Sequence, residues 1–280
     1  MGKDSKIAWT DHTFNPWWGC SKVSEECLHC YADSFTTRYG HDVFGPNKPR
    51  RFFGEKHWRE PLAWDAAAAS AGERHKVFCA SMGDLFEDRP DLDEPRARTF
   101  DLIFRTPHLD WLLCTKRPEN LAAMLPDGWH RQPWQNVWLL ATAGNADRFR
   151  ERWGHLKMIP AVVRGISAEP LLGPLTSALH ELRPAGAARP DWLIIGGESG
   201  FPGRPIGNGA GDPFDENAID GQELGAIHGA CQALGIAFFL KQLGSAFARH
   251  AHFRDRRAGA DPSEWPEIMR VRQSPVPRIC

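Results

Sequence analysis

The sequence lacks several features that would place the protein in a membrane or outside the cell. No apolar run approaches the roughly 20 residues that a membrane-spanning helix needs, and the first ten residues contain no apolar core typical of a secretory signal. The formal net charge is only −1, so no overall positive field attracts nucleic acid non-specifically. These absences predict a cytoplasmic protein that would contact nucleic acid only through local patches.

Cysteine is scarce, with seven residues in 280. An odd number of cysteines without a secretory signal argues against a disulfide framework. Three of the seven, Cys20, Cys27 and Cys30, nevertheless fall within eleven residues of one another. The other four are scattered along the chain, at positions 79, 114, 231 and 280.

The three clustered cysteines indicate a metal site. Three thiolates are one ligand short of a closed 4Fe-4S cluster, so a cluster held here leaves one iron open to another molecule, which favours catalysis. A structural zinc site needs four ligands, and the second C-x-x-C pair of such a site is missing. Zinc held by the three cysteines and by His12 or His29 remains the alternative. The protein would then be a non-catalytic, zinc-stapled nucleic-acid-binding module.

Short apolar runs bounded by turn residues alternate with helical stretches, which is typical of a parallel sheet built from βα units. Six strands are predicted at 76–82, 110–116, 136–143, 162–168, 191–197 and 236–242, with a seventh before or at 14–18. Helices are predicted at about 28–38 and at 94–106, 118–125, 146–155 and 221–234, and long loops at 40–62 and 198–217. We therefore predict an α/β protein, a partial parallel β/α barrel. Its single domain over 1–280 has a cysteine loop at 15–31 and a C-terminal extension at about 245–280.

Polar residues and glycines follow the predicted strands. Because the C-terminal ends of parallel strands point to one face, these residues are expected to share an active face with the cysteine loop, although each alone could be a helix cap. They are Ser81, Gly83, Asp84, Thr115, Lys116, Arg117, Thr142, Asn145, Ser167, Glu169, Gly196, Gly197, Glu198, Ser199, Lys241 and Gln242. The paired glycines do not match G-x-G-x-x-G, which argues against a Rossmann dinucleotide site but permits close approach of an adenosyl group.

Basic and aromatic side chains occur together in two segments, 48–53 and 249–257. This combination is typical of surfaces that bind single-stranded nucleic acid through phosphate contacts and base stacking. Ordinary solvated surface loops are the alternative interpretation of both segments.

The motifs together resemble a known family. The cysteine cluster followed by Tyr31, at the first loop of a β/α barrel, resembles the radical S-adenosylmethionine (SAM) superfamily. The motifs IAWTDHTFNPWWGC, SMGDLF, LLCTKRPE, ISAEPLLGP, IIGGESG and FFLKQLG resemble a phage-associated family long described as a domain of unknown function, over nearly the whole chain.

The resemblance implies roles for individual residues. Cys20, Cys27 and Cys30 would ligate a 4Fe-4S cluster that binds SAM, and Lys116 or Arg117 would hold the SAM carboxylate. Further cofactor contacts would come from Tyr31, Ser81, Met82, Gly83, Asp84, Thr142, Asn145, Ser167, Gly196 and Gly197. Glu169 and Lys241 would be a substrate-facing acid and amine, and Glu198 is a further candidate catalytic residue.

The resemblance also implies an activity. Reductive cleavage of SAM would give a 5′-deoxyadenosyl radical that abstracts hydrogen from the substrate, with electrons from a donor of the flavodoxin or ferredoxin type. The expected substrate is a hypermodified thymidine or other pyrimidine in phage DNA, or the corresponding nucleotide, which the enzyme would modify or isomerise in the host cytoplasm. A radical SAM lyase that repairs a DNA photoproduct is the alternative enzyme.

Overall fold

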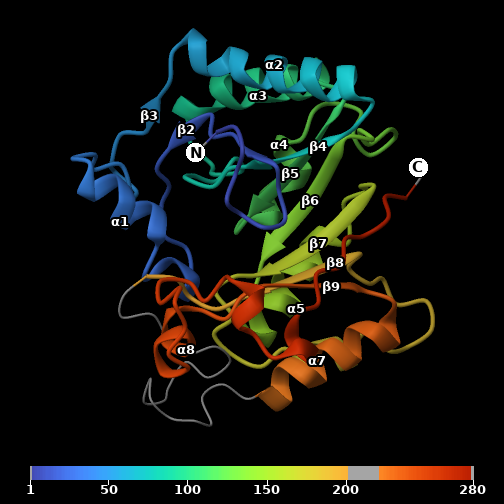
Figure 1. Cartoon of the computed structure of the whole chain (residues 1–280). Helices are drawn as coiled ribbons and strands as arrows, with labels where there is room; N and C mark the ends of the chain where they lie inside the picture. Colours follow the sequence, from blue (N-terminus) through green and yellow to red (C-terminus); the bar gives the residue numbers. More distant parts are fainter. Residues whose placement is uncertain (1, 201–220, 279–280) are drawn as a thin grey trace. The chain divides into compact units, whose positions relative to one another are not determined.

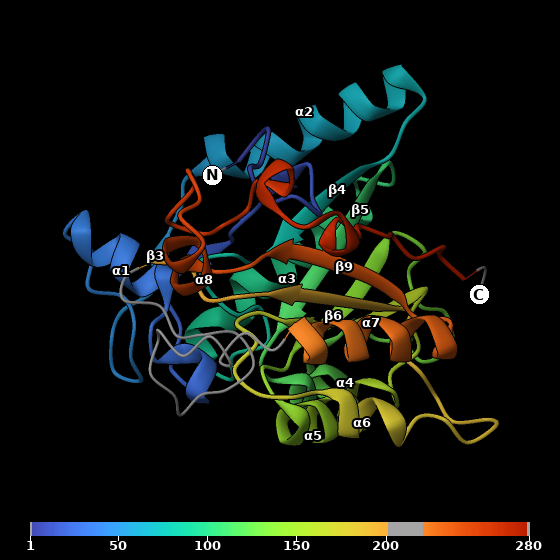
Figure 2. The same cartoon turned by 60° about the horizontal axis from the view of Figure 1, so that its bottom comes forward.

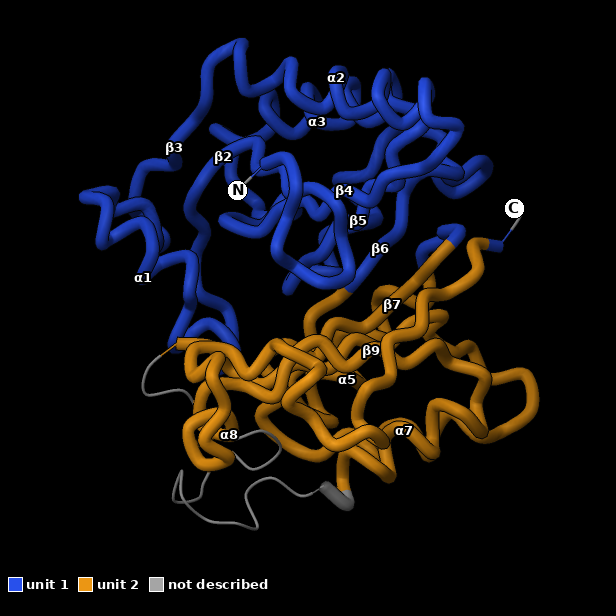
Figure 3. The backbone as a smooth tube through the Cα atoms, viewed as in Figure 1, with its two compact units in different colours: residues 1–140, 159–162, 278–280 blue, residues 141–158, 163–277 orange. Residues whose placement is uncertain are grey.

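The computed structural model describes residues 2–200 and 221–278. The chain divides into two compact units, which are shown in different colours in Figure 3. Unit 1 comprises residues 1–140, 159–162 and 278–280, and unit 2 comprises residues 141–158 and 163–277. The expectation of a single domain over 1–280 stays a prediction.

Seven strands form one sheet in the order β1-β4-β5-β6-β7-β8-β9. They are β1 (His12–Thr13), β4 (His75–Cys79), β5 (Leu109–Thr115), β6 (Val137–Thr142), β7 (Val163–Ala168), β8 (Trp192–Gly196) and β9 (Ala237–Gln242). The pairs β1–β4 and β4–β5 in unit 1 and β7–β8 and β8–β9 in unit 2 are all parallel. A parallel sheet that follows chain order is the topology of a partial β/α barrel, so the predicted fold class is confirmed.

The strands form where the sequence is almost continuously apolar. All residues of β6 and β8 are buried, as expected for strands of a parallel sheet that helices cover. The large side chains in the interior of unit 1 include Phe14, Trp17 and Trp111. This apolar interior supports the strand ends from which the polar side chains of the site project.

Helices of unit 1 are α1 (Tyr31–Arg38), α2 (Glu55–Ala71), α3 (Asp93–Phe104) and α4 (Leu121–Met124). Helix α2 packs beside α3 and against β4 and β5, as the upper part of Figure 1 shows. A separate two-stranded antiparallel sheet pairs β2 (Trp17–Trp18) with β3 (Arg51–Phe52). The cysteine loop therefore leaves β2 and leads into α1.

Helices of unit 2 are α5 (Ala146–Leu156), α6 (Thr176–His180), α7 (Gly221–Leu234) and α8 (Ser245–His250). Helix α7 packs against β9 and against α6, and Figure 2 shows it running beside the strand. Short 3₁₀ turns occur at Glu25–Cys27, Pro90–Leu92, Pro118–Asn120, Pro262–Glu264 and Glu267–Met269. The helices predicted at 94–106, 118–125, 146–155 and 221–234 are all present, with bounds shifted by a few residues and 118–125 split into a 3₁₀ turn and α4.

The prediction of a long loop at 40–62 is confirmed for residues 40–50 and wrong for most of the rest. Residues 51–52 form β3, and the 17-residue helix α2 begins at Glu55. Pro61 lies inside this helix, where proline normally disfavours helix because it lacks an amide hydrogen. Burial of Trp58 and Trp64 on one side of α2 outweighs that local preference. Most of the second predicted loop, 198–217, lies outside the described residues.

No helix in the described residues is long and apolar enough to cross a membrane.

Candidate functional site

The three clustered cysteines lie on the loop between β2 and α1. Cys27 ends a 3₁₀ turn and is buried, whereas Cys20 and Cys30 are half-buried. Cys30 is the residue that precedes the first turn of α1, so its backbone is extended. All three are free thiols. The side chains of Cys20 and Cys30 pack against the same small apolar cluster, Ala32, Val43, Phe44 and Met82.

Backbone contacts fix the chain on both sides of Cys20. The Gly19 amide donates to the Met82 carbonyl at 2.8 Å, and the Cys20 carbonyl accepts from the Gly45 amide at 3.0 Å. Gly19 has φ +103°, and a Cβ atom there would lie 2.1 Å from the Val43 carbonyl oxygen. Only glycine combines this backbone angle with so close a neighbour. The position before the first cysteine therefore requires glycine.

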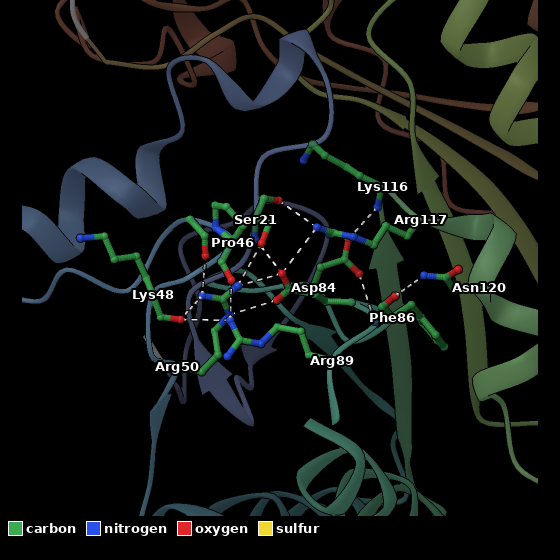
Figure 4. Close-up of polar contacts among 12 residues, drawn as sticks. Ser21, Pro46, Lys48, Arg50, Asp84, Phe86, Arg89, Lys116, Arg117 and Asn120 are labelled. Atoms are coloured by element: carbon green, nitrogen blue, oxygen red, sulfur yellow. Dashed lines mark hydrogen bonds and ion pairs between the residues drawn. The ribbon is translucent and has the colours of Figure 1, made fainter. Parts of the chain in front are cut away.

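Ser21, directly after Cys20, is held by three charged side chains. Its amide donates to Glu87 Oε1 at 2.8 Å, its hydroxyl accepts from Arg50 Nη2 at 3.2 Å, and its carbonyl accepts from Arg117 Nη2 at 2.8 Å. Figure 4 labels Ser21 together with two of these partners, Arg50 and Arg117. Arg50 and Glu87 also form a two-pronged ion pair, with bonds of 2.8 and 3.0 Å.

Asp84 accepts four hydrogen bonds inside unit 1. One oxygen, Oδ1, accepts from the Phe86 amide at 3.1 Å and the Thr115 hydroxyl at 2.7 Å. The other, Oδ2, accepts from the Lys116 amide and from Arg117 Nη1, both at 3.0 Å (Figure 4). The carboxylate is almost fully buried and joins the loop after β4 to the end of β5. These bonds occupy the acceptor sites that a ligand amine would use.

Asn15 and Tyr31 fix the backbone after β4. Asn15 Oδ1 accepts from the Met82 amide at 2.7 Å, and Asn15 Nδ2 donates to the Ser81 hydroxyl at 3.1 Å. The Tyr31 hydroxyl donates to the Ser81 carbonyl. Ser81, Met82, Gly83 and Asp84 are therefore brought together with the start of the cysteine loop and of α1.

The electrostatics of the site connect the cysteines to Lys116. Burial lowers the pKa of the Lys116 ammonium, but negative charge on nearby cysteines raises it, and the net pKa lies above the ordinary value; these cysteines are Cys27, Cys114, Cys30 and Cys20. The pKa of the Cys20 thiol is raised, chiefly by burial and then by the negative charges of Asp84 and Cys30. Four thiols therefore lie within electrostatic reach of one ammonium group.

The donor chemistry of the loop fits an iron–sulfur cluster, because the loop carries three free cysteines and cysteine thiolates are the usual ligands of such clusters. Within residues 2–200 and 221–278, no three His, Cys, Asp or Glu side chains lie close enough together to hold a metal ion. The three cysteines thus share one loop, and Cys20 and Cys30 share one apolar cluster, but the described residues do not form a closed metal site.

His12 is committed to contacts away from the cysteine loop. Its Nδ1 accepts from the Asp4 amide at 3.3 Å, its Nε2 lies 3.3 Å from His75 Nδ1, and its ring stacks on Trp64. Both ring nitrogens are therefore used at the start of β1 and β4. This arrangement argues against His12 as the fourth ligand of a zinc site, while His29 is exposed on the loop between Cys27 and Cys30.

Unit 2 brings together a second group of predicted residues. Glu169 follows β7 and lies 2.8 Å from the Lys241 ammonium in β9, and the Ser167 hydroxyl donates to the other Glu169 oxygen at 3.2 Å. A Cβ on Gly196 would lie 2.6 Å from Glu169 Oε1. The glycine at the end of β8 therefore leaves the space that the carboxylate occupies.

The remaining predicted residues of unit 2 have backbone roles. The Thr142 carbonyl accepts from Arg152 at 2.6 Å, and the Asn145 side chain caps α5 by accepting from the Arg148 amide at 2.9 Å. Gly197 packs against the Leu243 backbone, its carbonyl accepts from Gln242, and the Glu198 carbonyl accepts from the Ser245 amide at 2.9 Å. One active face shared by both units stays a prediction.

Sequence reasoning missed three residues of this site and misassigned one of them. Arg50 was expected in a nucleic-acid-binding patch, but it is buried and paired with Glu87, so it is unavailable to phosphate. Glu87 and Asn15 carried no signal because their partners are distant in sequence. In the second basic segment, Arg254 is exposed and pairs with Asp261 and Glu264, which is ordinary for a surface loop.

Comparison with family models matches residues 4–265 to DUF5131, which is described as a protein of unknown function. The chain belongs to this family. No curated protein matches it. The structure is similar to a spore photoproduct lyase variant with bound AdoMet and a dinucleoside spore photoproduct, at 12% identity and a TM-score of 0.47, covering 70% of this chain and 58% of that chain.

A second spore photoproduct lyase variant gives 11% identity and a TM-score of 0.46 with the same coverage. The DUF5131 chain thus spans 58% of the length of these enzymes. We transfer no residue role and no activity from this likeness.

Proposed function

We propose that this DUF5131 protein is a radical SAM enzyme whose Cys20, Cys27 and Cys30 hold a 4Fe-4S cluster. The observation that supports the proposal is that three free cysteines share one loop, with Cys20 and Cys30 packed against the same apolar cluster. When bound, the cluster would supply the electron for reductive cleavage of SAM.

Lys116 is a better partner than Arg117 for the carboxylate of SAM. The Arg117 guanidinium already donates to Asp84 and to the Ser21 carbonyl, so its donors are committed inside the protein. Lys116 contacts Asp84 only through its backbone amide, so its ammonium takes no part in that ion pair. We propose that the Lys116 ammonium holds the carboxylate of SAM through a charge-assisted hydrogen bond.

The backbone of 81–83 is the proposed surface for the methionine part of SAM. Asn15 and Tyr31 fix this segment beside the cysteine loop, and Asp84 orients it without offering a vacant oxygen. In unit 2, Glu169 and Lys241 form a half-buried acid and amine pair at the ends of two strands. We propose that this pair contacts the substrate.

For the substrate we propose a modified pyrimidine in DNA or the corresponding nucleotide, with an external electron donor of the flavodoxin or ferredoxin type. The exposed aromatic side chains near the cysteine loop, such as Tyr39 and Phe52, support a stacking surface for a base. Arg51 adds a cation to this segment, where its guanidinium lies 4.4 Å from the centre of the Trp18 ring.

The test is an anaerobic assay with chemically reconstituted, dithionite-reduced protein and SAM. Wild-type protein should release 5′-deoxyadenosine, Cys27→Ala should release none, and Cys231→Ala, whose thiol lies in α7 of unit 2, should match the wild type. Adding DNA that contains 5-substituted thymidine should change the nucleoside mass profile. A wild-type protein that holds iron and sulfide but leaves SAM intact would contradict the proposal.

A further inference from the structure

Two buried ion pairs surround the residue that follows Cys20. Three of the four side chains, those of Arg50, Glu87 and Arg117, contact Ser21 directly. The fourth, Asp84, pairs with Arg117 and supports its contact with Ser21. We call these four residues the Ser21 clamp.

The first pair joins three segments of unit 1. The Arg50 side chain has no exposed surface, and that of Glu87 is 4% exposed. Arg50 Nη1 also donates to carbonyl oxygens of the loop that leads from α1 to β3, those of Val43, Gly45 and Lys48, at 2.9 to 3.1 Å. The pair therefore connects this loop, the segment after β4 and Ser21.

The second pair connects Ser21 to the end of β5. Arg117 follows Thr115, the last residue of that strand, and donates to Ser21 and to Asp84 through different nitrogens. Arg117 Nη2 also lies 3.7 Å from Glu87 Oε1, so the two pairs form one network. Ser21 is thus held through its amide, its hydroxyl and its carbonyl at once.

A role in stability alone does not explain this arrangement. Burying a charged pair costs desolvation energy, and well-packed apolar side chains of similar volume stabilise a fold as well or better. Charged hydrogen bonds, however, fix the direction of each partner more tightly than apolar packing does. The geometry indicates that the network fixes the position of the Ser21 backbone and, through the peptide bond between them, that of Cys20.

We propose that Arg50, Glu87, Arg117 and Asp84 are positioning residues that fix Cys20 as the anchored ligand onto which a cluster is built. The proposal rests on the proposed function in taking Cys20 as a ligand. The clamp acts on the backbone of Ser21, so its effect is present in the metal-free protein. Positioning and cluster binding are therefore separable by experiment.

The test compares two pairs of substitutions. The double variant Arg50→Met/Glu87→Met removes half of the clamp without leaving a buried charge unpaired. Its matched control, Arg98→Met/Glu55→Met, removes an Arg–Glu pair between α2 and α3 that is exposed to solvent. The single variant Glu87→Gln serves as a conservative substitution that can still accept from the Ser21 amide.

The first readout is the alkylation rate of each cysteine in metal-free protein, mapped by peptide mass spectrometry. Loss of a charge-assisted bond to Ser21 should raise the Cys20 rate about tenfold or more. The rates at fully buried Cys79 and Cys231, which report general unfolding, should stay unchanged. The matched control should leave all three rates at wild-type values.

The second readout is the electron paramagnetic resonance spectrum of reconstituted, reduced protein, which should change in the clamp variant and stay unchanged in the control. Unchanged Cys20 reactivity, or an equal rise at all three cysteines, would overturn the positioning role. A wild-type protein that binds no iron would overturn the proposed function instead, while the alkylation rates would still decide the clamp.

Discussion

Replacing Asp84 by asparagine should destabilise the protein strongly. Asparagine retains one oxygen for the Phe86 amide and the Thr115 hydroxyl but places an NH₂ group against the other two donors, the Lys116 amide and Arg117. Two donor–acceptor bonds are replaced by donor–donor contacts, and a buried guanidinium loses its carboxylate.

The magnitude follows from burial. The side chains of Asp84 and Arg117 are 6% and 8% exposed, so water does little to replace the lost charge. Breaking a buried pair on one side costs about 3 to 5 kcal/mol of unfolding free energy, which is a large fraction of the roughly 5 to 15 kcal/mol that holds a typical domain folded.

Urea unfolding followed by tryptophan fluorescence measures this effect. The matched control is Asp91→Asn, because Asp91 pairs with Arg89 while its side chain is 45% exposed; it should change the unfolding free energy by about 1 kcal/mol or less. If Asp84→Asn were as stable as the control, Asp84 would not be a structural acceptor, and a ligand contact would be its better explanation.

Three further predictions follow from local geometry. Gly19→Ala should lower the urea midpoint and the iron content after reconstitution, because the alanine Cβ would lie 2.1 Å from the Val43 carbonyl oxygen. Unchanged values of both would contradict the requirement for glycine at this position. Gly196→Ala should displace Glu169 and reduce SAM-dependent turnover more than iron content, and equal losses of both would count against the acid's role. The pKa of His12 is lowered from its ordinary value of 6.5, first by burial and then by the charge of His75. The folded protein therefore disfavours protonated His12, so the stability that neutral His12 contributes is present above pH 6.5 and is lost as the pH falls below that value. The urea midpoint should drop between pH 8 and pH 5, and less so in His12→Phe; an identical drop in both proteins would refute this.

The sequence predicted the sheet well because its strands are apolar runs bounded by turn residues, a signal carried by neighbouring residues. Six predicted strands match β4 to β9 within a few residues. Helix α2 was missed because Pro61 and the surrounding glycines and prolines dominate the local signal. Burial of Trp58 and Trp64 against the rest of unit 1 stabilises that helix.

Site prediction failed where function depends on pairing between distant segments. Arg50 stands in a basic and aromatic run, so sequence alone could not show that its charge is neutralised by Glu87, 37 positions away. For Asp84 the sequence correctly predicted its place after β4. It did not predict the four protein groups that donate hydrogen bonds to its carboxylate. Sequence can therefore predict which polar residues lie at strand ends. It cannot predict which of their oxygen atoms remain available to a ligand.

The most direct test of the central claim is the metal content of wild-type protein prepared under anaerobic conditions, compared with single serine variants of Cys20, Cys27 and Cys30 and with Cys231→Ser. The account predicts about four irons and four sulfides per wild-type chain. It predicts the same for Cys231→Ser and a large loss in each of the other three variants. A colourless wild-type protein that carries one zinc ion and no sulfide would contradict it and make the cysteines a structural site.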